Sequence, residues 1–378
     1  MSDHPLNALE TFVRRFVVLP SEPDYSIFVL WITHTYFTGV LTTTPRLALL
    51  SPEYGCGKSR SLEILEKLCF RGEKLDYCTR SYLMRTIEII REESGKSPTL
   101  LVDEIDSVFK NKSDEASEAL RAFANTGYRK SGSYGITEGE GKNRHPKKFP
   151  TFAPMALAGK GEILPESVLT RAIEIRLQKR LSIQPIEDFL TNSVTFQCNE
   201  LVEWLNEWSD LNAPEIETEN VAIDSISDRD REVWLPLFAV AKLAGSNWVE
   251  KCYEALYQHQ KVKKTSDIPR ERQLLQDCLT VFAGRESLKS ELLIQGLKEL
   301  LDSDYNSMNY GRGISAKYLA KIVRSYDIQP TQIRFGESTY KGYYRHSFES
   351  ANARYSEEAT VSHISETPET PETEQVLL

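Results

Sequence analysis

The chain has 378 residues with ordinary apolar and charged content, enough for two or three domains with their own cores. Its net charge of −9 is misleading, because the segment after Tyr355 holds six glutamates without any lysine or arginine, and the remainder is near −3. Acidity therefore does not exclude nucleic acid as a partner. The six cysteines show no ligand spacing, so neither a zinc site nor a disulfide framework is expected, and a reducing cytoplasm is the default location.

Neither a signal peptide nor a membrane helix is expected. No leader pattern opens the chain. The most apolar stretch, from Tyr25 to Leu41, is about the minimum length for a span, but it contains His34 and four threonines or serines. A buried helix is the better interpretation, and no membrane partner is predicted.

The first half of the chain alternates helices with apolar strands. The spacing of apolar residues predicts helices over 7–19, about 24–40, the residues after Gly57, 81–94 and 113–132. Buried strands are expected at 46–51, 100–103, 152–159 and 173–179, with a short candidate at 75–78. Strands separated by helices predict an α/β fold, with a parallel sheet that carries helices on both faces.

The other segments suggest further domains. Residues 130–148 are rich in Gly, Lys and Arg and are expected to form an exposed loop. After a first domain over 1–182, helical patterns predict a lid over 183–265. Residues 266–355 show the order helix, helix, helix, hairpin, which is typical of a winged-helix-like domain. The acidic tail, 356–378, has the composition of a disordered segment.

Two segments carry the strongest chemical signal. Segment 45–65 reads as a strand, a glycine loop that ends in Gly-Lys-Ser at 57–59, and a helix. Segment 98–106 is an apolar strand that ends in Asp103 and Glu104. Together they supply what hydrolysis of a nucleoside triphosphate needs: amides and a lysine for phosphates, a hydroxyl and an aspartate for Mg²⁺, and a glutamate for water. The combination indicates a P-loop ATPase.

Each residue of this set has an expected role. Lys58 should bridge the β- and γ-phosphates, Ser59 should ligate Mg²⁺ directly, Asp103 should hold it through water, and Glu104 should polarise the attacking water. The expected nucleotide contacts are Gly55, Cys56, Gly57, Lys58, Ser59 and Arg60. The first glycine of the G-x4-G-K-[ST] consensus falls on Pro52, so the loop begins in an unusual way. An ordinary turn is the weaker alternative, because a turn does not need Lys and Ser here.

Charge that develops at the γ-phosphate usually requires an arginine. The candidates are Arg129, Arg144, Arg171 and Arg229. Arg171 lies between the last two apolar strands, a position that suits an arginine supplied to a neighbouring subunit. A surface salt bridge explains Arg171 equally well. Asp106 either joins the metal site or stabilises the start of the next helix.

The chain resembles the DUF3631 family, P-loop ATPases found mainly in phages, plasmids and other mobile elements, many beside primase-like domains. The resemblance covers about residues 8–355 and is carried by segments 29–37, 45–68, 99–109, 120–132, 154–180, 230–248 and 314–355. It implies an AAA+-like or helicase-like core that uses ATP and Mg²⁺, a helical lid and a winged-helix-like region.

The resemblance also implies roles for two arginine positions. Arg171 would be the finger that acts on a neighbouring subunit, and Arg229 or Arg231 a nucleotide sensor on the lid. AAA+ proteins usually carry a polar sensor where this chain has Ala158 and Gly159. Either Lys160 or Asn125 replaces it, or this sensor is absent.

The main hypothesis is an oligomeric ATPase that moves along or remodels single-stranded or forked DNA in the replication of a mobile element. A separate primase or another replication or defence protein would be its partner. Residues 261–345 hold fifteen Lys or Arg against ten Asp or Glu. Phosphate contacts would come from Lys317, Lys321, Arg324, Lys341, Tyr343, Tyr344 and Arg345, and the basic segment 144–148 could touch single-stranded DNA.

Three other interpretations stay open. The basic residues of 261–345 fit a solvated helix beside tyrosines packed in a small core, and 144–148 fits a solvated loop. The chain could instead be a nucleotide-switched scaffold that docks a protein, for example in host–phage conflict. A small-molecule kinase is less well supported, because a kinase rarely needs adjacent Asp and Glu residues to activate water.

Overall fold

The computed structural model describes residues 4–75, 78–110, 115–138, 144–160, 164–217, 228–266, 270–300, 305 and 313–355. The chain divides into two compact units, Met1–Lys261 and Val262–Leu378. Each unit has its own hydrophobic core. The predicted tail, 356–378, lies outside the described residues.

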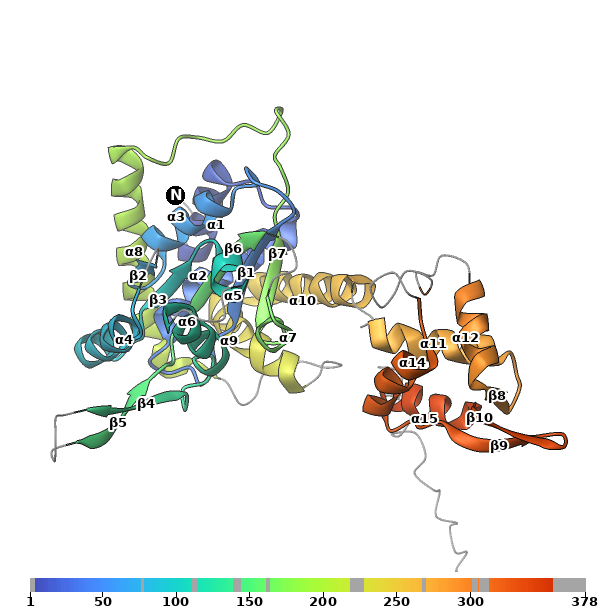
Figure 1. Cartoon of the computed structure of the whole chain (residues 1–378). Coiled ribbons are helices and arrows are strands. Elements are labelled where there is room, and N and C mark those ends of the chain that lie inside the picture. Colours follow the sequence, from blue (N-terminus) through green and yellow to red (C-terminus); the bar gives the residue numbers. More distant parts are fainter. Residues whose placement is uncertain are drawn as a thin grey trace, which may run out of the picture. The chain divides into compact units, whose positions relative to one another are not determined.

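A five-stranded parallel sheet forms the centre of the first unit (Figure 1). Its strand order is β2-β3-β6-β1-β7, and every paired neighbour runs parallel. The strands are β2 (Gly72–Lys74), β3 (Thr99–Val102), β6 (Met155–Lys160), β1 (Arg46–Ser51) and β7 (Ala172–Arg176). The predicted α/β fold is therefore confirmed.

The short strand expected at 75–78 is displaced: β2 runs from Gly72 to Lys74, Leu75 and Cys78 are not part of it, and 76–77 lie outside the described residues. A Cβ atom at this glycine would lie 2.5 Å from the carbonyl oxygen of Glu66, so only glycine allows the chain to turn so closely into the strand. Leu75 still donates its amide to Leu101 O at 2.8 Å. The apolar residues after the glycine predicted a strand in this region, but they could not show at which residue the pairing with the next strand starts.

Helices cover both faces of the sheet, and the strands alternate between two cores. Leu47 and Leu49 of β1 point into one core, whereas Ala48 and Leu50 point into the other, as the two-residue period of a strand requires. The first core is shared with α1 (Pro5–Phe16), α2 (Glu22–His34), α3 (Lys58–Leu68), α8 (Asn192–Asn212), α9 (Asp228–Ala244) and α10 (Ser246–Ser266). The second core is shared with α4 (Arg80–Ser94), α5 (Ile105–Lys110), α6 (Glu115–Thr126) and α7 (Glu166–Leu169).

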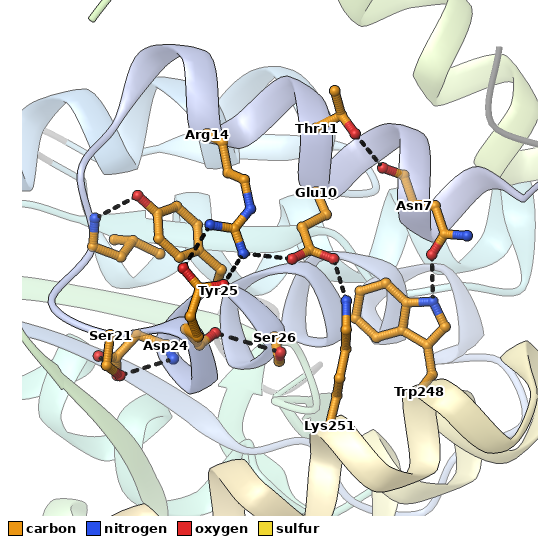
Figure 2. Close-up of polar contacts among 12 residues, drawn as sticks. Asn7, Glu10, Thr11, Arg14, Ser21, Asp24, Tyr25, Ser26, Trp248 and Lys251 are labelled. Atoms are coloured by element: carbon orange, nitrogen blue, oxygen red, sulfur yellow. Dashed lines mark hydrogen bonds and ion pairs between the residues drawn. The ribbon is translucent and has the colours of Figure 1, made fainter. Parts of the chain in front are cut away.

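Polar contacts fasten α10 to α1 (Figure 2). The indole nitrogen of Trp248 donates to Asn7 Oδ1 at 2.9 Å, and Lys251 Nζ donates to Glu10 Oε2 at 2.5 Å. Glu10 also pairs with Arg14 at 2.6 Å. The helices predicted as a lid thus share one core with the N-terminal helices. Their status as a separate domain over 183–265 stays a prediction.

The segment predicted as an exposed loop is a β-hairpin. Strands β4 (Ser133–Glu138) and β5 (His145–Pro150) pair antiparallel from Ser133↔Pro150 to Glu138↔His145. Its base is anchored by aromatic residues, since Phe149 is fully buried and Tyr134 stacks on Phe123 of α6 at 6.2 Å. The loop prediction was wrong because the many Gly, Lys and Arg residues concealed a two-residue alternation around Tyr134 and Phe149.

The second unit is built around a three-stranded antiparallel sheet of order β8-β10-β9. In chain order it contains α11 (Arg270–Phe282), β8 (Ser287–Lys289), α12 (Ser290–Glu299), α14 (Ala316–Val323), β9 (Thr331–Phe335), β10 (Ser338–Tyr344) and α15 (Arg345–Tyr355). The predicted order of three helices and a hairpin is present, with β8 and α15 in addition.

The second strand of that hairpin ends earlier than the sequence suggested. Strand β10 stops at Tyr344, and Phe348 lies on α15, where its ring packs 5.7 Å from Tyr343 and 5.5 Å from Phe282. Tyr343 is therefore a core residue, with 1% of its surface exposed, and is not available to DNA. In the described part of the chain, no helix combines the length and the apolar character needed to cross a membrane.

Candidate nucleotide site

The glycine loop connects the carboxyl end of β1 to the start of α3. Gly55 and Gly57 adopt φ angles of 76° and 90°, in the left-handed region that glycine enters without strain. The first helical hydrogen bond runs from Ser61 N to Gly57 O at 2.9 Å. The preceding amides, those of residues 58–60, therefore belong to a free helix N-terminus, which favours phosphate through both hydrogen bonds and the helix dipole.

The lysine of the loop is held by neutral groups. Lys58 Nζ donates to the hydroxyl of Ser51 and, at 3.2 Å, to the carbonyl oxygen of Glu53. Ser51 Oγ in turn donates to Glu53 O at 2.7 Å. Because no carboxylate accepts from this ammonium among the described contacts, an incoming phosphate would compete only with weaker neutral acceptors.

Two of the expected nucleotide contacts are limited by their side chains. Cys56 is 5% exposed and belongs to the core, so only its backbone can face a phosphate. The guanidinium of Arg60 pairs with Glu63 at 2.9 Å and lies 5.5 Å from the centre of the Phe189 ring. Ser59, by contrast, is exposed at the first turn of α3, which suits the predicted metal ligand.

The acidic pair follows directly after β3. Asp103 Oδ1 accepts a hydrogen bond from the amide of Glu104 at 2.8 Å. Glu104 has a φ angle of 49°, which costs energy for a residue with a side chain and is typical of functional positions. The next residue, Ile105, is fully buried and packs where a Cβ atom on Gly159 would come within 2.2 Å. The backbone at Glu104 is thus fixed on both sides while the residue itself stays exposed.

The sheet brings these two segments to the same end, where the parallel strands finish; this end is the carboxyl edge. Ser51, at the end of β1, pairs with Lys160 on β6, and Val102, at the end of β3, pairs with Leu157 on the other side of β6. One strand therefore separates the loop from the acidic pair, which corresponds to about 10 Å. The carboxyl edge of a parallel sheet is where α/β proteins bind their ligands.

The sensor position is resolved in part by packing. Gly159 cannot carry a side chain because Ile105 fills that space. Lys160 lies at the carboxyl edge, with its ammonium 4.9 Å from the centre of the exposed Tyr54 ring. Asn125 instead donates to Arg121 O at 2.9 Å within its own helix, α6. Of the two proposed substitutes, only Lys160 is placed near the loop.

Arg171 lies at the opposite end of the sheet, where the parallel strands begin; this end is the amino edge. Its neighbour Ala172, the first residue of β7, pairs with Arg46, the first residue of β1. The loop begins after the sixth and last residue of β1, so the length of that strand, roughly 17–20 Å, separates Arg171 from the loop. Figure 1 shows α7 and α3 at opposite ends of the sheet. This arginine cannot serve the nucleotide site of its own chain.

The expectation that Arg229 binds nucleotide from the lid needs correction for the same reason. Its Nη1 donates to the hydroxyl of Tyr128 at 2.6 Å, and the guanidinium of Arg171 lies over the same ring at 4.8 Å. Both arginines therefore sit at the amino edge. The sequence had assigned Arg229 by analogy with lid residues, but the packing of α9 directs it away from the loop of its own chain.

Sequence reasoning missed two residues at this edge, Tyr128 and Arg46. Arg46 is fully buried and donates three hydrogen bonds to carbonyl oxygens: to Phe123 at 2.9 Å, Ala124 at 3.0 Å and Ala153 at 2.7 Å. Burial, with the charge of Arg171, lowers the pKa of this guanidinium to about 9. An arginine at the start of an otherwise apolar strand was the available signal; for Tyr128 there was none.

The described residues contain no group of three or more His, Cys, Asp or Glu side chains that could hold a metal by themselves. Ser59 and Asp103 offer a hydroxyl and a carboxylate, the hard oxygen donors that Mg²⁺ uses together with phosphate oxygens and water. The donor set thus fits Mg²⁺ held with a nucleotide.

Comparison with known proteins connects the chain to a sequence family. Residues 176–355 match the family described as protein of unknown function DUF3631. A curated protein of Saccharopolyspora erythraea, an uncharacterized 28.9 kDa protein in the xis 5′ region, is 30% identical over 162 residues. That alignment covers 42% of this chain and 60% of the relative, so the chain spans about three fifths of the relative's length.

Solved structures show only distant likeness. The apo A form of the C-terminal region of NrS-1 has 13% identity and a TM-score of 0.42, covering 91% of this chain and 76% of that one. The Aeropyrum pernix Orc1 protein in complex with DNA has 14% identity and a TM-score of 0.26, and the match covers 91% of this chain and 95% of that one. The active helicase Cch of SCCmec type IV has 10% identity and a TM-score of 0.36, and the match covers 85% of this chain and 68% of that one.

The family match begins at the last residue of β7 and runs to the last residue of α15. It is narrower than the resemblance over about 8–355, because it leaves out the glycine loop and the acidic pair. Over residues 176–355, the chain is similar to the DUF3631 family.

Proposed function

We propose that this chain is a Mg²⁺-dependent ATPase of the AAA+-like class that works as an oligomer on DNA. One observation supports the ATPase most strongly. Lys58 and Ser59 at the start of α3, and Asp103 and Glu104 at the end of β3, lie at the same edge of the parallel sheet with one strand between them.

The residues at this edge divide the chemistry between them. Lys58 leaves its neutral acceptors for the β- and γ-phosphates, and the amides of the loop hold the same phosphate chain. Ser59 and Asp103 hold Mg²⁺, which neutralises phosphate charge and orients the reacting group. Glu104 accepts a hydrogen bond from the attacking water and aligns it with the γ-phosphate.

The oligomer follows from the position of Arg171. This arginine and the nucleotide loop occupy opposite edges of one sheet, so the guanidinium of Arg171 reaches a γ-phosphate only when a second copy presents its amino edge to the carboxyl edge of the first. Such a contact joins two different surfaces, one from each copy. A head-to-tail contact of that kind closes into a ring when its rotation permits.

Two sets of exposed cations support DNA as the target. Arg144 and Lys148 lie on or beside β5 of the hairpin. In the second unit, Lys317, Lys321 and Arg324 are exposed, at helical positions i, i+4 and i+7, while Leu319 and Val323 of the same helix face the core. The order of elements in this unit is that of a winged helix, with α14 in the place of the helix that enters a DNA groove.

The deciding experiment measures ATP hydrolysis with and without single-stranded DNA, together with the mass of the protein with and without ATP. The proposal expects hydrolysis that DNA stimulates and that Lys58→Ala and Glu104→Gln both abolish. Absence of DNA binding at low salt would contradict the proposal that the protein acts on DNA. Slow, DNA-indifferent turnover with nucleotide-dependent changes in mass would favour the switched scaffold, and acceptor-dependent phosphate transfer would favour a kinase.

The role of the second unit has its own test. Replacing Lys317 and Lys321 by alanine should weaken binding uniformly across DNA sequences and reduce the slope of log affinity against log salt by about 2. Lys179→Ala with Lys242→Ala removes the same charge from exposed positions on the first unit and serves as the control. Equal slopes in the two double variants would argue against α14 as a DNA contact.

A further inference from the structure

Tyr128 occupies the centre of the arginine group at the amino edge. It follows α6 and is 7% exposed. Three guanidinium groups from separate parts of the chain surround its ring: the distances to the ring centre are 5.2 Å for Arg129, 4.8 Å for Arg171 and 5.6 Å for Arg229. Like charges do not gather in this way unless something attracts each of them, and the face of an aromatic ring does so.

The three arginines are held differently. Arg129 pairs with Glu232, and Arg229 lies 3.5 Å from the same carboxylate while it donates to the Tyr128 hydroxyl. Arg171 donates through Nη1 to the carbonyl oxygen of Ser167, and its Nε is buried without a hydrogen-bond partner. Within the described residues, no carboxylate lies at ion-pair distance from Arg171. The ring of Tyr128 is therefore the main group that locates this guanidinium.

A ring is a suitable support for an arginine that must bind phosphate elsewhere. A carboxylate would occupy the in-plane N–H donors of the guanidinium, in the same fork geometry that a phosphate needs. An aromatic face attracts the cation from above and leaves those donors available. The arrangement keeps Arg171 in place without neutralising it.

The backbone of Tyr128 also joins this edge to the base of the hairpin. Its carbonyl oxygen accepts from Thr44 N at 2.8 Å, next to β1, and the preceding Gly127 accepts from Ala153 N at 3.2 Å. A Cβ atom on Gly127 would lie 2.2 Å from Thr151 O and 2.9 Å from Arg46 Nη2. This close packing leaves little room for Tyr128 to move independently of the strands that follow it.

We infer that Tyr128 is a positioning residue, which holds Arg171 ready for the nucleotide of a neighbouring subunit and couples it to the base of the β4–β5 hairpin. The inference rests on the proposed function, because it assumes that Arg171 acts on the site of another copy. It assigns a role to a tyrosine that contacts neither the nucleotide nor the metal.

The test compares Tyr128→Leu, which removes the aromatic face, with Tyr128→Phe, which keeps it. We expect Tyr128→Leu to lower kcat roughly 10- to 100-fold, with KM for ATP unchanged, because a misplaced catalytic group affects the transition state rather than binding. Tyr128→Phe should retain most of the wild-type kcat. If Tyr128→Leu lowers the melting temperature, Tyr128→Met replaces it as an apolar side chain without a ring.

Mixed oligomers separate positioning from a structural defect. A Lys58→Ala subunit has no working site but an intact Arg171, so mixing it with Tyr128→Leu subunits should restore hydrolysis at the sites of the Tyr128 variant. A merely structural role for Tyr128 predicts a loss that mixing does not rescue, and that result, or an unchanged kcat, would overturn the inference.

Arg171→Ala tests the underlying proposal separately. If this variant hydrolyses ATP at the wild-type rate, the proposed action of Arg171 on a neighbour fails, whatever Tyr128 does. If it is impaired and is rescued by Lys58→Ala subunits while Tyr128→Leu remains fully active, only the inference about Tyr128 fails.

Discussion

The carboxyl edge of the parallel sheet is open, whereas its amino edge is closed. At the carboxyl edge, Ser59 and Glu104 are exposed and Lys58 rests on neutral acceptors. At the amino edge, Arg46 is fully buried under the end of α6, and Tyr128 is almost covered by three further arginines. One edge thus presents exposed groups with few contacts to the core, and the other presents groups that the protein already holds in place.

Under the proposed function, this difference allows one short sheet to contribute to two sites. A catalytic arginine must be in place before the phosphate arrives, so it benefits from a rigid support. A phosphate loop must exchange its own contacts for those of the ligand, so weak neutral contacts suit it better. A rigid support and exchangeable contacts are difficult to combine at one edge of a sheet. They are compatible when the arginine and the loop lie at opposite edges and meet between neighbouring copies.

The largest expected effect lies at the carboxyl edge. Glu104→Gln should reduce ATP hydrolysis roughly 10²- to 10⁴-fold while ATP still binds, because the amide keeps the shape but no longer activates water. Lys58→Ala should instead lose binding, since it removes the cation that meets the phosphates. Fluorescent-nucleotide titration alongside phosphate release distinguishes the two. Equal loss of binding in both variants would contradict the division of roles.

At the amino edge the largest effect should be on stability. Arg46→Met removes three hydrogen bonds to buried carbonyl oxygens and should lower the free energy of unfolding by about 3 kcal/mol. Arg129→Met removes the surface ion pair with Glu232 and should change the free energy of unfolding by at most about 0.5 kcal/mol. Urea titration followed by tryptophan fluorescence measures both. If the two variants prove equally stable, the amino edge is not the rigid support described above.

A smaller effect of opposite sign is expected at Glu104. Glycine tolerates the φ angle of 49° better than glutamate, so Glu104→Gly should raise the free energy of unfolding by up to about 1 kcal/mol while it abolishes hydrolysis. Glu53→Gly is the control, because Glu53 is exposed and has no positive φ angle. The prediction fails if both glycines destabilise the protein to the same extent in thermal unfolding.

The smallest effect tests a contact that belongs to neither edge. Burial alone would raise the pKa of Glu10, but hydrogen bonds from Lys251 and Arg14 outweigh it, and the net pKa lies below the ordinary value of 4.5. A lowered carboxyl pKa stabilises the fold above that ordinary value, and this stabilisation disappears as pH falls through the folded-state pKa. Glu10→Gln should therefore cost about 0.5–1 kcal/mol at neutral pH and little in acid.

Thermal melts from pH 7 to pH 3 follow this contact, with the exposed Glu254→Gln as the matched control. Both variants should hydrolyse ATP normally, since Glu10 contacts Lys251 and Arg14 rather than residues of the glycine loop (Figure 2). A loss of activity in Glu10→Gln alone would show that the helices predicted as a lid influence the site.

Much of the fold could be predicted because its signals are local. The alternation of β1 between two cores, the cap of α4 by Thr79 and Gly95, and the order of elements in the second unit all follow from neighbouring residues. The hairpin was missed because its many Gly, Lys and Arg residues concealed the two-residue alternation, which becomes evident only when the two strands pair. Pairing across a turn is a property of two segments together.

The sequence alone predicted that Lys58, Ser59, Asp103 and Glu104 meet at the carboxyl edge, because the first two follow the loop after one strand and the last two directly follow another. In a parallel sheet, residues just after strands must meet at one edge, so their spacing in the chain was sufficient. Only the tertiary structure decided that Arg171 and Arg229 belong at the other edge, around Tyr128. Those contacts join residues 43 to 101 positions apart, and they depend on how helices pack rather than on any local pattern.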